Sequence, residues 1–408
     1  MSARLALPGW LRRYARLLQL LLVLILLVIV AGVAYVEVRR HQPLTLPAPT
    51  GPSAVGRVEY AWTDQARIDP LAPRAGTKRS LVVWAWYPAV RVPGARPAPY
   101  LPPRWANVSD QQRGTIGQQL FQSADSIRTN SSTQAALAPG AARYPVLIFE
   151  PGFGTIPTQY TTLLEDLASH GYIIFAITPT YSADAVVFPD GRMVEASPAG
   201  SLPESNTGLQ AASTRLVMVW ARDVIFVMNQ LQRMNASRGQ LFSGRLDLAR
   251  LGVFGHSFGG ATAAQVCRMD ARCKAGIDLD GDLFGSVVHT GLTTPFMVLQ
   301  SDRGACTDAN CRSMQGRVRA VLRTLRPGTG YDLSITNMEH FNFSDYAVEF
   351  TPLRLFGVLG SIDGMRGLQI TRAYVRAFFD TYLSNRPSPL LQGPSRAYPE
   401  VRFIALER

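Results

Sequence analysis

The chain has 408 residues, 47% of them apolar and 17% charged, and a formal net charge of +12. This apolar content excludes a disordered chain, and 34 Gly and 28 Pro without a repeating period exclude a collagen-like fibre. Residues 1–56 carry six Arg and one acidic residue, so five of the twelve net charges belong to that segment. The remaining Arg are scattered and only two Lys occur, so we expect no nucleic-acid partner.

The N-terminal segment predicts a membrane anchor. Residues 17–36 form an apolar run in which only Gln19 is strongly polar. A helix of this length spans about 30 Å, the thickness of the hydrocarbon core of a bilayer. A cleaved signal peptide is the alternative, because a basic segment precedes the run and Gly32-Val33-Ala34 resembles a cleavage site. The apolar part of a signal peptide usually has about 7–15 residues, so the longer run favours an uncleaved anchor.

The charges on the two sides of this run predict its orientation. Four Arg precede it and two follow it closely, and positively charged flanks tend to stay in the cytoplasm. We therefore expect residues 1–16 to form a cytoplasmic basic N-terminus and residues 17–36 a single transmembrane span. Everything after the span then lies outside, in the periplasm or the extracellular space. Residues 37–56 contain four Pro and predict a semi-rigid spacer before a globular domain at residues 57–408.

Strands and helices alternate along the globular domain. We expect strands at residues 81–87, 146–149, 172–177, 251–254, 275–279, 295–299 and 331–336, and helices at residues 158–169, 209–234, 261–269, 317–325 and 368–383. This order predicts an α/β fold with a mostly parallel sheet and helices on both of its faces. Two irregular insertions, at about 89–142 and 181–207, leave the sheet where a lid would cover a site. Ligands of such sheets bind at the carboxyl ends of the strands.

A motif directly after the strand at 251–254 predicts a nucleophile. Residues 255–259 read Gly-His-Ser-Phe-Gly and fit G-x-S-x-G, in which a strained strand-to-helix turn exposes the serine hydroxyl. The motif alone carries a real risk of a chance match. Here an apolar strand precedes it and a helix follows it, as the turn requires, so we predict that Ser257 is the nucleophile.

A serine nucleophile needs a general base, and the sequence contains five His. His41 lies in the predicted spacer, His256 inside the motif, His170 at a helix end and His289 in an irregular segment. His340 follows the last predicted strand, which is where this fold delivers its base. We therefore predict that His340 is the general base.

Two carboxylates compete for the acid that orients the base. Asp280 follows the strand at 275–279, and Asp302 follows the next strand at 295–299. Both satisfy the chain order Ser, acid, His, and the general architecture of α/β-hydrolases accepts the later one. Position along the chain therefore leaves the choice open.

Several blocks of the sequence resemble those of the plasma and type II platelet-activating-factor acetylhydrolases, a family of α/β-hydrolases. The blocks are Leu-Gly-Val-Phe-Gly-His-Ser-Phe-Gly-Gly-Ala-Thr at 251–262, Gly-Ile-Asp-Leu-Asp at 276–280, Tyr-Pro-Val-Leu-Ile-Phe-Glu-Pro-Gly-Phe-Gly at 144–154, Asp-Leu-Ala-Ser-His-Gly at 166–171 and His-Phe-Asn-Phe-Ser-Asp at 340–345. They are scattered over roughly residues 80–385, and the serine and histidine blocks are the most specific. The resemblance implies an α/β-hydrolase fold and an acid after the earlier strand, at Asp280, with Asp302 as the alternative.

The oxyanion hole is expected to use two backbone N–H groups. One belongs to Phe258, the residue after the nucleophile, and the other to the loop after Phe149. The resemblance implies that this second donor is Phe153. The sequence departs from the family at Pro151, where a His usually precedes the Gly, but a backbone donor does not depend on that side chain.

Four Cys remain. Cys267 and Cys273 are six residues apart and Cys306 and Cys311 are five apart, and neither spacing is a zinc pattern. Outside the cytoplasm two short-loop disulfides are the expected state, and four free buried thiols are the alternative. We find no metal or cofactor motif and expect no cofactor.

Together these features predict a membrane-anchored serine ester hydrolase that acts on a small-molecule or lipid ester. The resemblance implies short or oxidised acyl esters of phospholipids. A general carboxylesterase or polyester hydrolase is the second interpretation and an acyltransferase a third, because a fold does not fix a function. A membrane-tethered binding module without catalysis is the alternative from another class, and the complete set of catalytic side chains counts against it. The sequence does not predict the oligomeric state.

Overall fold

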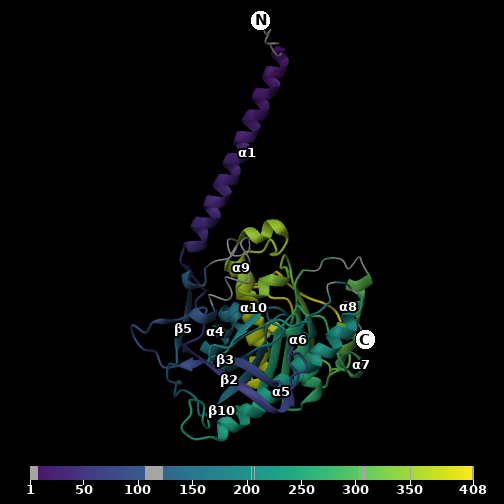
Figure 1. Cartoon of the computed structure of the whole chain (residues 1–408). Helices are drawn as coiled ribbons and strands as arrows, with labels where there is room; N and C mark the ends of the chain where they lie inside the picture. The colour runs from purple at the N-terminus through teal and green to yellow at the C-terminus, as the bar shows by residue number, and fades with distance from the viewer. Residues whose placement is uncertain are drawn as a thin grey trace.

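A computed structural model describes residues 8–105, 123–203, 205, 207–302, 304, 309–349 and 351–406. Within these residues, twelve strands form one mixed sheet in the order β1-β5-β2-β3-β7-β6-β10-β11-β12-β13-β14, with β4 paired to β5 (Figure 1). The strands are β1 Leu44–Thr45, β2 Ala54–Ile68, β3 Lys78–Ala89, β4 Pro97–Pro99, β5 Ile127–Thr133, β6 Tyr144–Glu150, β7 Ile173–Thr178, β10 Leu246–His256, β11 Ala275–Leu279, β12 Phe296–Gln300, β13 Gly330–Ile335 and β14 Val401–Phe403.

β7, β6, β10, β11, β12 and β13 run parallel to one another and make up the centre of the sheet. Every residue of β6, β7, β11 and β12 is buried. Parallel strands are covered on both faces and are therefore apolar throughout, which is why the sequence shows them as short uninterrupted apolar runs. β2, β3 and β14 pair in antiparallel fashion, so the sheet is mixed.

Helices cover both faces of this sheet, as the sequence predicts. On one face α4 and α10 pack with Leu147 and Ile174, and on the other α5, α6 and α8 pack with Val146 and Phe175. Successive residues of a strand point to opposite faces, so each strand contributes to both layers. The helices are α4 Thr161–Ser169, α5 Leu209–Ala236, α6 Phe258–Met269, α8 Ala309–Leu322 and α10 Gly364–Leu383.

The described parts of the two insertions are more ordered than the sequence indicates. β4 and β5 pair within the first, and β8 Ala185–Val187 and β9 Met193–Glu195 form a separate hairpin in the second. Trp105 and Phe188 belong to the main hydrophobic core, each with 2% of its surface exposed. These parts therefore extend the core instead of forming a detached lid. Residues 106–122, 204 and 206 of the insertions lie outside the described residues.

The stretch expected to be a spacer is docked on the domain. β1 pairs in parallel with β5, and Leu46 is buried in the core. The backbone N–H and the hydroxyl of Thr50 both donate to Asp166 Oδ1, each at 2.8 Å. β2 begins at Ala54, before the expected domain boundary at residue 57. Residues 44–56 thus differ from a free spacer, because their polar backbone groups find partners on β5 and α4.

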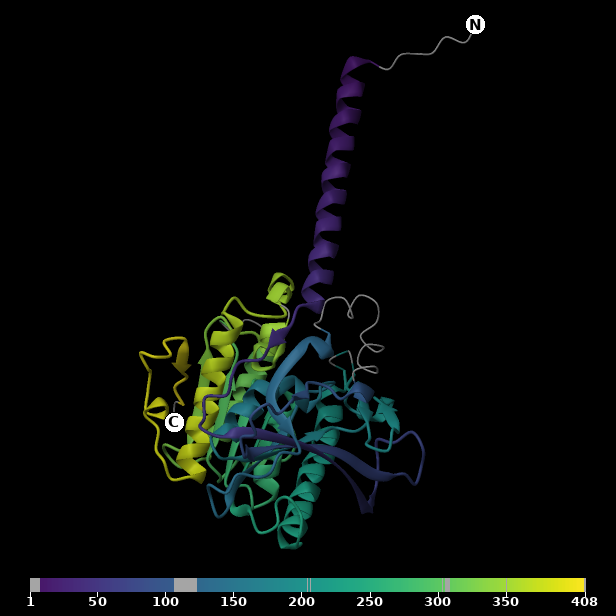
Figure 2. The ribbon, with the colours of Figure 1, turned by 90° about the vertical axis from the view of Figure 1, so that its left-hand side faces the viewer.

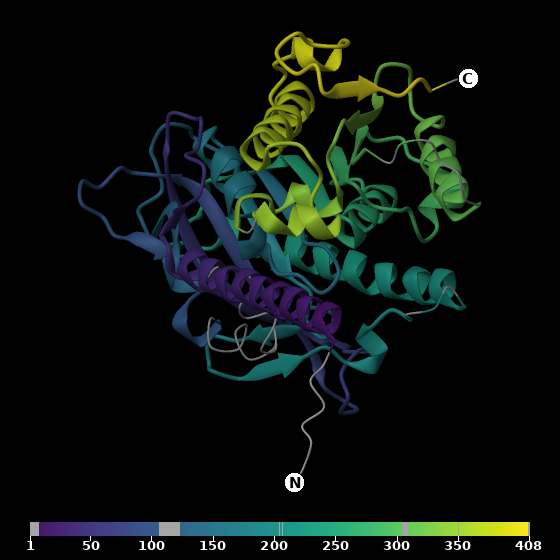
Figure 3. The same cartoon turned by 90° about the horizontal axis from the view of Figure 1, so that it is seen from above.

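The helix α1, Gly9–His41, stands away from the sheet (Figure 2). Among the described residues it is the one helix long and apolar enough to cross a membrane, with a mean hydropathy of 3.1 and no buried part in its most apolar window. It contains the apolar run at 17–36, and both a membrane span and a signal sequence fit its length and composition. Seen from above, it lies over the domain close to the segment around α9, Tyr346–Glu349 (Figure 3).

One of the two expected disulfides joins the end of α6 to the turn that precedes β11. Cys267 and Cys273 are bonded, with Cα atoms 5.0 Å apart. Cys311 is also disulfide-bonded. Cys306 lies outside the described residues, so its pairing with Cys311 stays a prediction.

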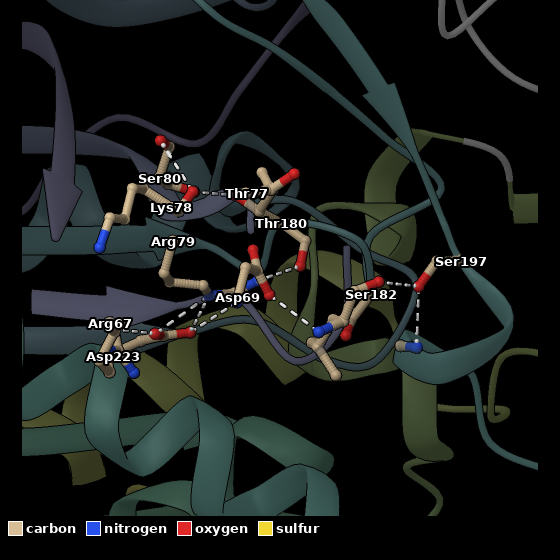
Figure 4. Close-up of polar contacts among 12 residues, drawn as sticks. Arg67, Asp69, Thr77, Lys78, Arg79, Ser80, Thr180, Ser182, Ser197 and Asp223 are labelled. Carbon is tan, nitrogen blue, oxygen red and sulfur yellow. Dashed lines mark hydrogen bonds and ion pairs between the residues drawn. The ribbon is translucent and has the colours of Figure 1, made fainter. Parts of the chain in front are cut away.

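A buried cluster of charges joins the hairpin of β2 and β3 to α5 (Figure 4). The guanidinium group of Arg79 is fully buried and donates to Asp69 Oδ2 at 3.1 Å, to Asp223 Oδ2 at 2.6 Å and to the Thr180 carbonyl oxygen at 2.8 Å. Arg67 adds a second donor to Asp223 at 2.6 Å. Three segments distant in sequence therefore meet at one cation. Removing one member leaves an uncompensated charge in the interior.

We expect Arg79→Leu to destabilise the domain by about 3–5 kcal/mol, because Asp69 remains buried without its cation and Asp223 keeps only Arg67. Arg250→Leu is the matched control, since Arg250 pairs with Asp247 at 2.7 Å while 38% of its side chain is exposed. Exposed pairs of this kind contribute about 0–1 kcal/mol. Urea unfolding followed by tryptophan fluorescence measures both variants. Equal losses would contradict the stabilising role of the cluster.

Candidate active site

The predicted nucleophile lies at the junction of β10 and α6. Ser257 has a φ of 55° and a ψ of −119°, a backbone conformation that few residues other than glycine adopt. Its N–H donates to the carbonyl oxygen of Leu279, at the end of β11, over 2.8 Å. Strand, strained turn and helix are the context that the G-x-S-x-G motif requires.

Close backbone contacts require glycines around this turn. A Cβ atom at Gly259 would lie 2.1 Å from the carbonyl oxygen of Glu150, on β6. A Cβ atom at Gly260 would lie 1.8 Å from Asp278 Oδ1, on β11. Atoms in a close-packed interior do not approach so closely, so neither position accepts a side chain. The neighbouring strands therefore hold the turn in one conformation.

His340 and Asp280 meet beside the turn. His340 begins η4, His340–Phe343, shortly after β13, and its Nδ1 lies 2.7 Å from Asp280 Oδ2. Asp280 is 3% exposed and also accepts hydrogen bonds from the Ser301 N–H at 2.8 Å and the Ser301 hydroxyl at 2.9 Å. A carboxylate at Nδ1 selects the tautomer whose Nε2 accepts a proton. The His340 side chain is 37% exposed, so a substrate has access to it.

Asp302, the alternative acid, makes different contacts. Its N–H donates to the Met338 carbonyl oxygen at 2.9 Å, and its Oδ2 accepts the Asn337 N–H at 2.9 Å. Both partners are backbone groups between β13 and His340. Asp302 therefore braces the loop that carries His340, whereas Asp280 contacts the imidazole itself.

The two residues expected to supply the oxyanion donors contact each other through their side chains. Phe258 is the first residue of α6, and the N–H groups of a first helical turn have no partner within the helix. Phe153 follows β6, and its ring contacts that of Phe258 edge to face with centroids 6.3 Å apart. The rings of Trp220 and Phe284 also contact Phe258, with centroids at 4.9 and 5.9 Å. Apolar surroundings of this kind strengthen electrostatic interactions with a developing charge.

Three residues contribute to the site without being predicted from the sequence: Ser301, Tyr160 and His256. Ser301 directly follows β12, at the same sheet edge as Asp280, and this position is the signal that could identify it. His256 is expected only as the variable residue of the motif, yet its ring is buried against that of His340, with centroids 4.4 Å apart. Burial, reinforced by His340, lowers the pKa of His256 to about 3. No sequence pattern points to Tyr160.

The arrangement supplies the parts of covalent acyl transfer. A serine on a strained turn, a histidine oriented by a carboxylate and backbone donors nearby are what such a reaction requires. Among the residues that the structure describes, no group of three or more His, Cys, Asp or Glu side chains is arranged to hold a metal ion.

Comparison with known proteins agrees with this arrangement. A family model described as "Platelet-activating factor acetylhydrolase, isoform II" matches residues 41–188 and 228–387. A protein of Arthroderma benhamiae named "Probable 1-alkyl-2-acetylglycerophosphocholine esterase" is 28% identical over an alignment of 381 positions that covers 88% of this chain and 93% of that protein. The platelet-activating factor acetylhydrolase of Bos taurus is 26% identical over an alignment of 287 positions that covers 63% of this chain and 61% of that protein.

A solved structure extends the likeness to the fold. The ferulic acid esterase from Streptomyces cinnamoneus superposes with a TM-score of 0.73 and 31% sequence identity, over 89% of this chain and 99% of that one. This match confirms the α/β fold expected from the sequence, and the family model spans more than half of the chain. The chain therefore belongs to the family of platelet-activating factor acetylhydrolase, isoform II, and is an ester hydrolase.

Proposed function

We propose that the chain hydrolyses carboxylic esters with Ser257 as nucleophile, His340 as general base and Asp280 as the carboxylate that orients the base. The observation that carries this proposal is the 2.7 Å hydrogen bond between His340 and Asp280 beside the strained Ser257 turn. Membership in a family of esterases supports the same reaction.

In the proposed reaction the Ser257 hydroxyl oxygen attacks the ester carbonyl carbon while His340 Nε2 takes the hydroxyl proton. The N–H groups of Phe258 and Phe153 stabilise the negative charge on the carbonyl oxygen. His340 then gives the proton to the departing alcohol and the acyl group stays on Ser257. Water attacks this acyl-enzyme by the same route and releases the acid. Asp280 stays ionised and stabilises the imidazolium.

Ser257→Ala is expected to lower kcat for a short-chain nitrophenyl ester by about 10⁴-fold or more, because the acyl-enzyme no longer forms. Release of nitrophenolate measures the rate, and a fluorophosphonate probe is expected to label only the wild type. Ser237→Ala, at the end of α5, is the control and is expected to keep its activity. Turnover by Ser257→Ala at the wild-type rate would falsify the assignment. An unlabelled wild type would favour a binding module.

Asp280→Asn is expected to lower kcat by about 10⁴-fold, because an amide at this position favours the wrong tautomer of His340. The Asp302 carboxylate accepts hydrogen bonds from the backbone N–H groups of Asn337 and Gly304, and Asp302→Asn keeps one acceptor oxygen for them, so we expect it to lower kcat by less than about ten-fold. Steady-state kinetics compares the two isosteric variants, and circular dichroism checks that both are folded. A larger loss in Asp302→Asn would assign the acid to that residue instead.

We propose short or oxidised acyl esters of phospholipid type as substrates. The names of the Arthroderma benhamiae and Bos taurus relatives, which refer to acetyl esters, support the short acyl group. The ferulic acid esterase neighbour favours an aromatic acyl ester as a second candidate, and the rings of Phe153 and Phe284 near Ser257 fit such a group. The values of kcat/KM for an acetylated ether phospholipid and for methyl ferulate distinguish the two candidates. Ser257→Ala serves as the blank in both assays.

We also propose that α1 anchors the enzyme in a membrane, with the N-terminus in the cytoplasm and the catalytic domain outside. Val36, near the outer end of the apolar run, packs against the cluster of Leu353 and Leu359 in the domain. Leu355 and Phe356, in η5 (Thr351–Phe356), are 85% and 71% exposed. Neighbouring apolar side chains this exposed fit a surface that faces lipid.

The Cys267–Cys273 disulfide supports the outside location, because disulfides persist in oxidising compartments. The arginines before and after the apolar run support the same orientation.

Removal of residues 1–34 is expected to move the protein from the membrane fraction to the soluble fraction, because it removes most of the apolar run but keeps Val36. Turnover of a soluble nitrophenyl ester is expected to stay within about two-fold, since the domain keeps its core. Carbonate-washed membranes and immunoblotting measure the distribution, and protease added to intact cells tests the orientation. Full-length protein in the soluble fraction would contradict the anchor, and a protected domain would contradict the orientation.

A further inference from the structure

The side chain of His256 connects three parts of the proposed site. It comes from the position directly before Ser257, and it is 1% exposed. Its Nε2 lies 3.0 Å from the carbonyl oxygen of His340, and its Nδ1 lies 2.8 Å from the hydroxyl of Tyr160. The Tyr160 hydroxyl in turn accepts the N–H of Gly152 over 3.1 Å. Gly152 directly precedes Phe153, the expected second oxyanion donor.

The partners determine where each hydrogen lies. A carbonyl oxygen only accepts, so His256 Nε2 carries the hydrogen that it shares with His340. The neutral ring then has an acceptor at Nδ1, and Tyr160 donates to it. Deep burial keeps this ring neutral, since it lowers the pKa of His256 to about 3. The result is one directed chain of hydrogen bonds from the Gly152 N–H through Tyr160 and His256 to the His340 carbonyl.

The contacts around Gly152 support this series of hydrogen bonds. The Thr155 hydroxyl donates to the Gly152 carbonyl oxygen at 2.6 Å, so both polar backbone groups of Gly152 are bound. A Cβ atom at Gly152 would lie 3.0 Å from His256 Nδ1 and 3.2 Å from the Tyr160 hydroxyl. The loop after β6 therefore rests directly on the two side chains, and a larger residue at 152 would displace them.

We propose that Tyr160 and His256 are positioning residues that hold the Phe153 loop and the His340 loop in place relative to Ser257. The hydrogen bond to Gly152 fixes the peptide next to the one that carries the Phe153 N–H. The hydrogen bond to His340 fixes the backbone of the base. The inference rests on the proposed function, because it assigns a role to groups that act through Ser257, His340 and Phe153. Displacements of about 1 Å at such groups lower kcat strongly.

Tyr160→Phe tests this inference, because it removes one hydroxyl and keeps the buried ring. We expect kcat for a nitrophenyl ester to fall about ten-fold with KM within about two-fold, as displacement of transition-state contacts requires. A trifluoromethyl ketone forms an oxyanion on Ser257, so its affinity is expected to weaken by a similar factor of about ten. A role in folding alone would leave the affinity of this analogue unchanged in the folded protein.

Tyr172→Phe is the matched control. The Tyr172 hydroxyl is also largely buried and donates to Asp380 Oδ1 over 2.8 Å, on the part of α10 that packs near β7. Its loss is expected to change kcat by less than about two-fold, since it contacts neither loop of the site. Thermal unfolding shows whether the two variants lose similar stability.

Two variants of His256 test separately the hydrogen bond to His340 and the hydrogen bond to Tyr160. The amide of His256→Gln reaches the place of Nε2 and keeps a donor to His340, whereas His256→Asn keeps an acceptor for Tyr160. Adding Tyr160→Phe is therefore expected to cause little further loss of kcat in the His256→Gln protein and nearly its full loss in the His256→Asn protein. If Tyr160→Phe lowers kcat by the same factor in both proteins, the proposed series of hydrogen bonds is wrong.

The inference also fails if Tyr160→Phe lowers kcat no more than Tyr172→Phe, and this comparison stands even where the His256 variants do not fold. The experiments distinguish failure of this inference from failure of the proposed function. Wild-type turnover that Ser257→Ala abolishes establishes the hydrolase first, and an unaffected Tyr160→Phe then removes only the positioning role.

Discussion

Ser257 is held in a left-handed backbone conformation by the two strands that flank β10. On one side the carbonyl oxygen of Glu150 would lie 2.1 Å from a Cβ atom at Gly259, and on the other the Leu279 carbonyl oxygen accepts the Ser257 N–H. Strain of this kind persists only where the surroundings over-determine it. The same two strands end in the Phe153 loop and in Asp280. The constraint that strains the turn therefore also determines how Ser257, the Phe153 loop and Asp280 lie relative to one another.

The fold is predictable where burial alone determines the residue types. β11 matches its expected range of 275–279, because a strand covered on both faces is an uninterrupted apolar run. β2 escapes prediction because it is half exposed and antiparallel, and it carries charges such as Arg57. Arg57 is nevertheless buried, with its guanidinium over the rings of Trp84 and Trp86. Contacts of this kind depend on residues distant in sequence and leave no local pattern.

In the candidate site, too, some residues can be predicted from a local pattern and others cannot. Ser257 and His340 can be predicted because a motif or a strand end marks each. The choice between Asp280 and Asp302 depends on geometry, because both follow adjacent parallel strands and only one reaches the imidazole. Residues that act through another residue leave even less signal. His256 stands at a variable position of its motif, and Tyr160 lies 96 residues away from it in the chain. Only the tertiary structure brings them together.

The helix α1 and the segment that follows His340 contact the same small hydrophobic cluster. Val36, at the end of the apolar run, and Phe341, the residue after His340, both pack against Leu353 and Leu359. The chain between α1 and the sheet is bound through β1 and Thr50, so it does not act as a flexible tether. A flexible linker would determine only the effective concentration of the domain near α1. A packed contact also fixes the distance and the direction of the domain relative to α1. With α1 in a bilayer as proposed, the His340 loop faces the lipid surface from a fixed height. A lipid ester would then reach Ser257 by a short displacement from the membrane, without first dissolving in water.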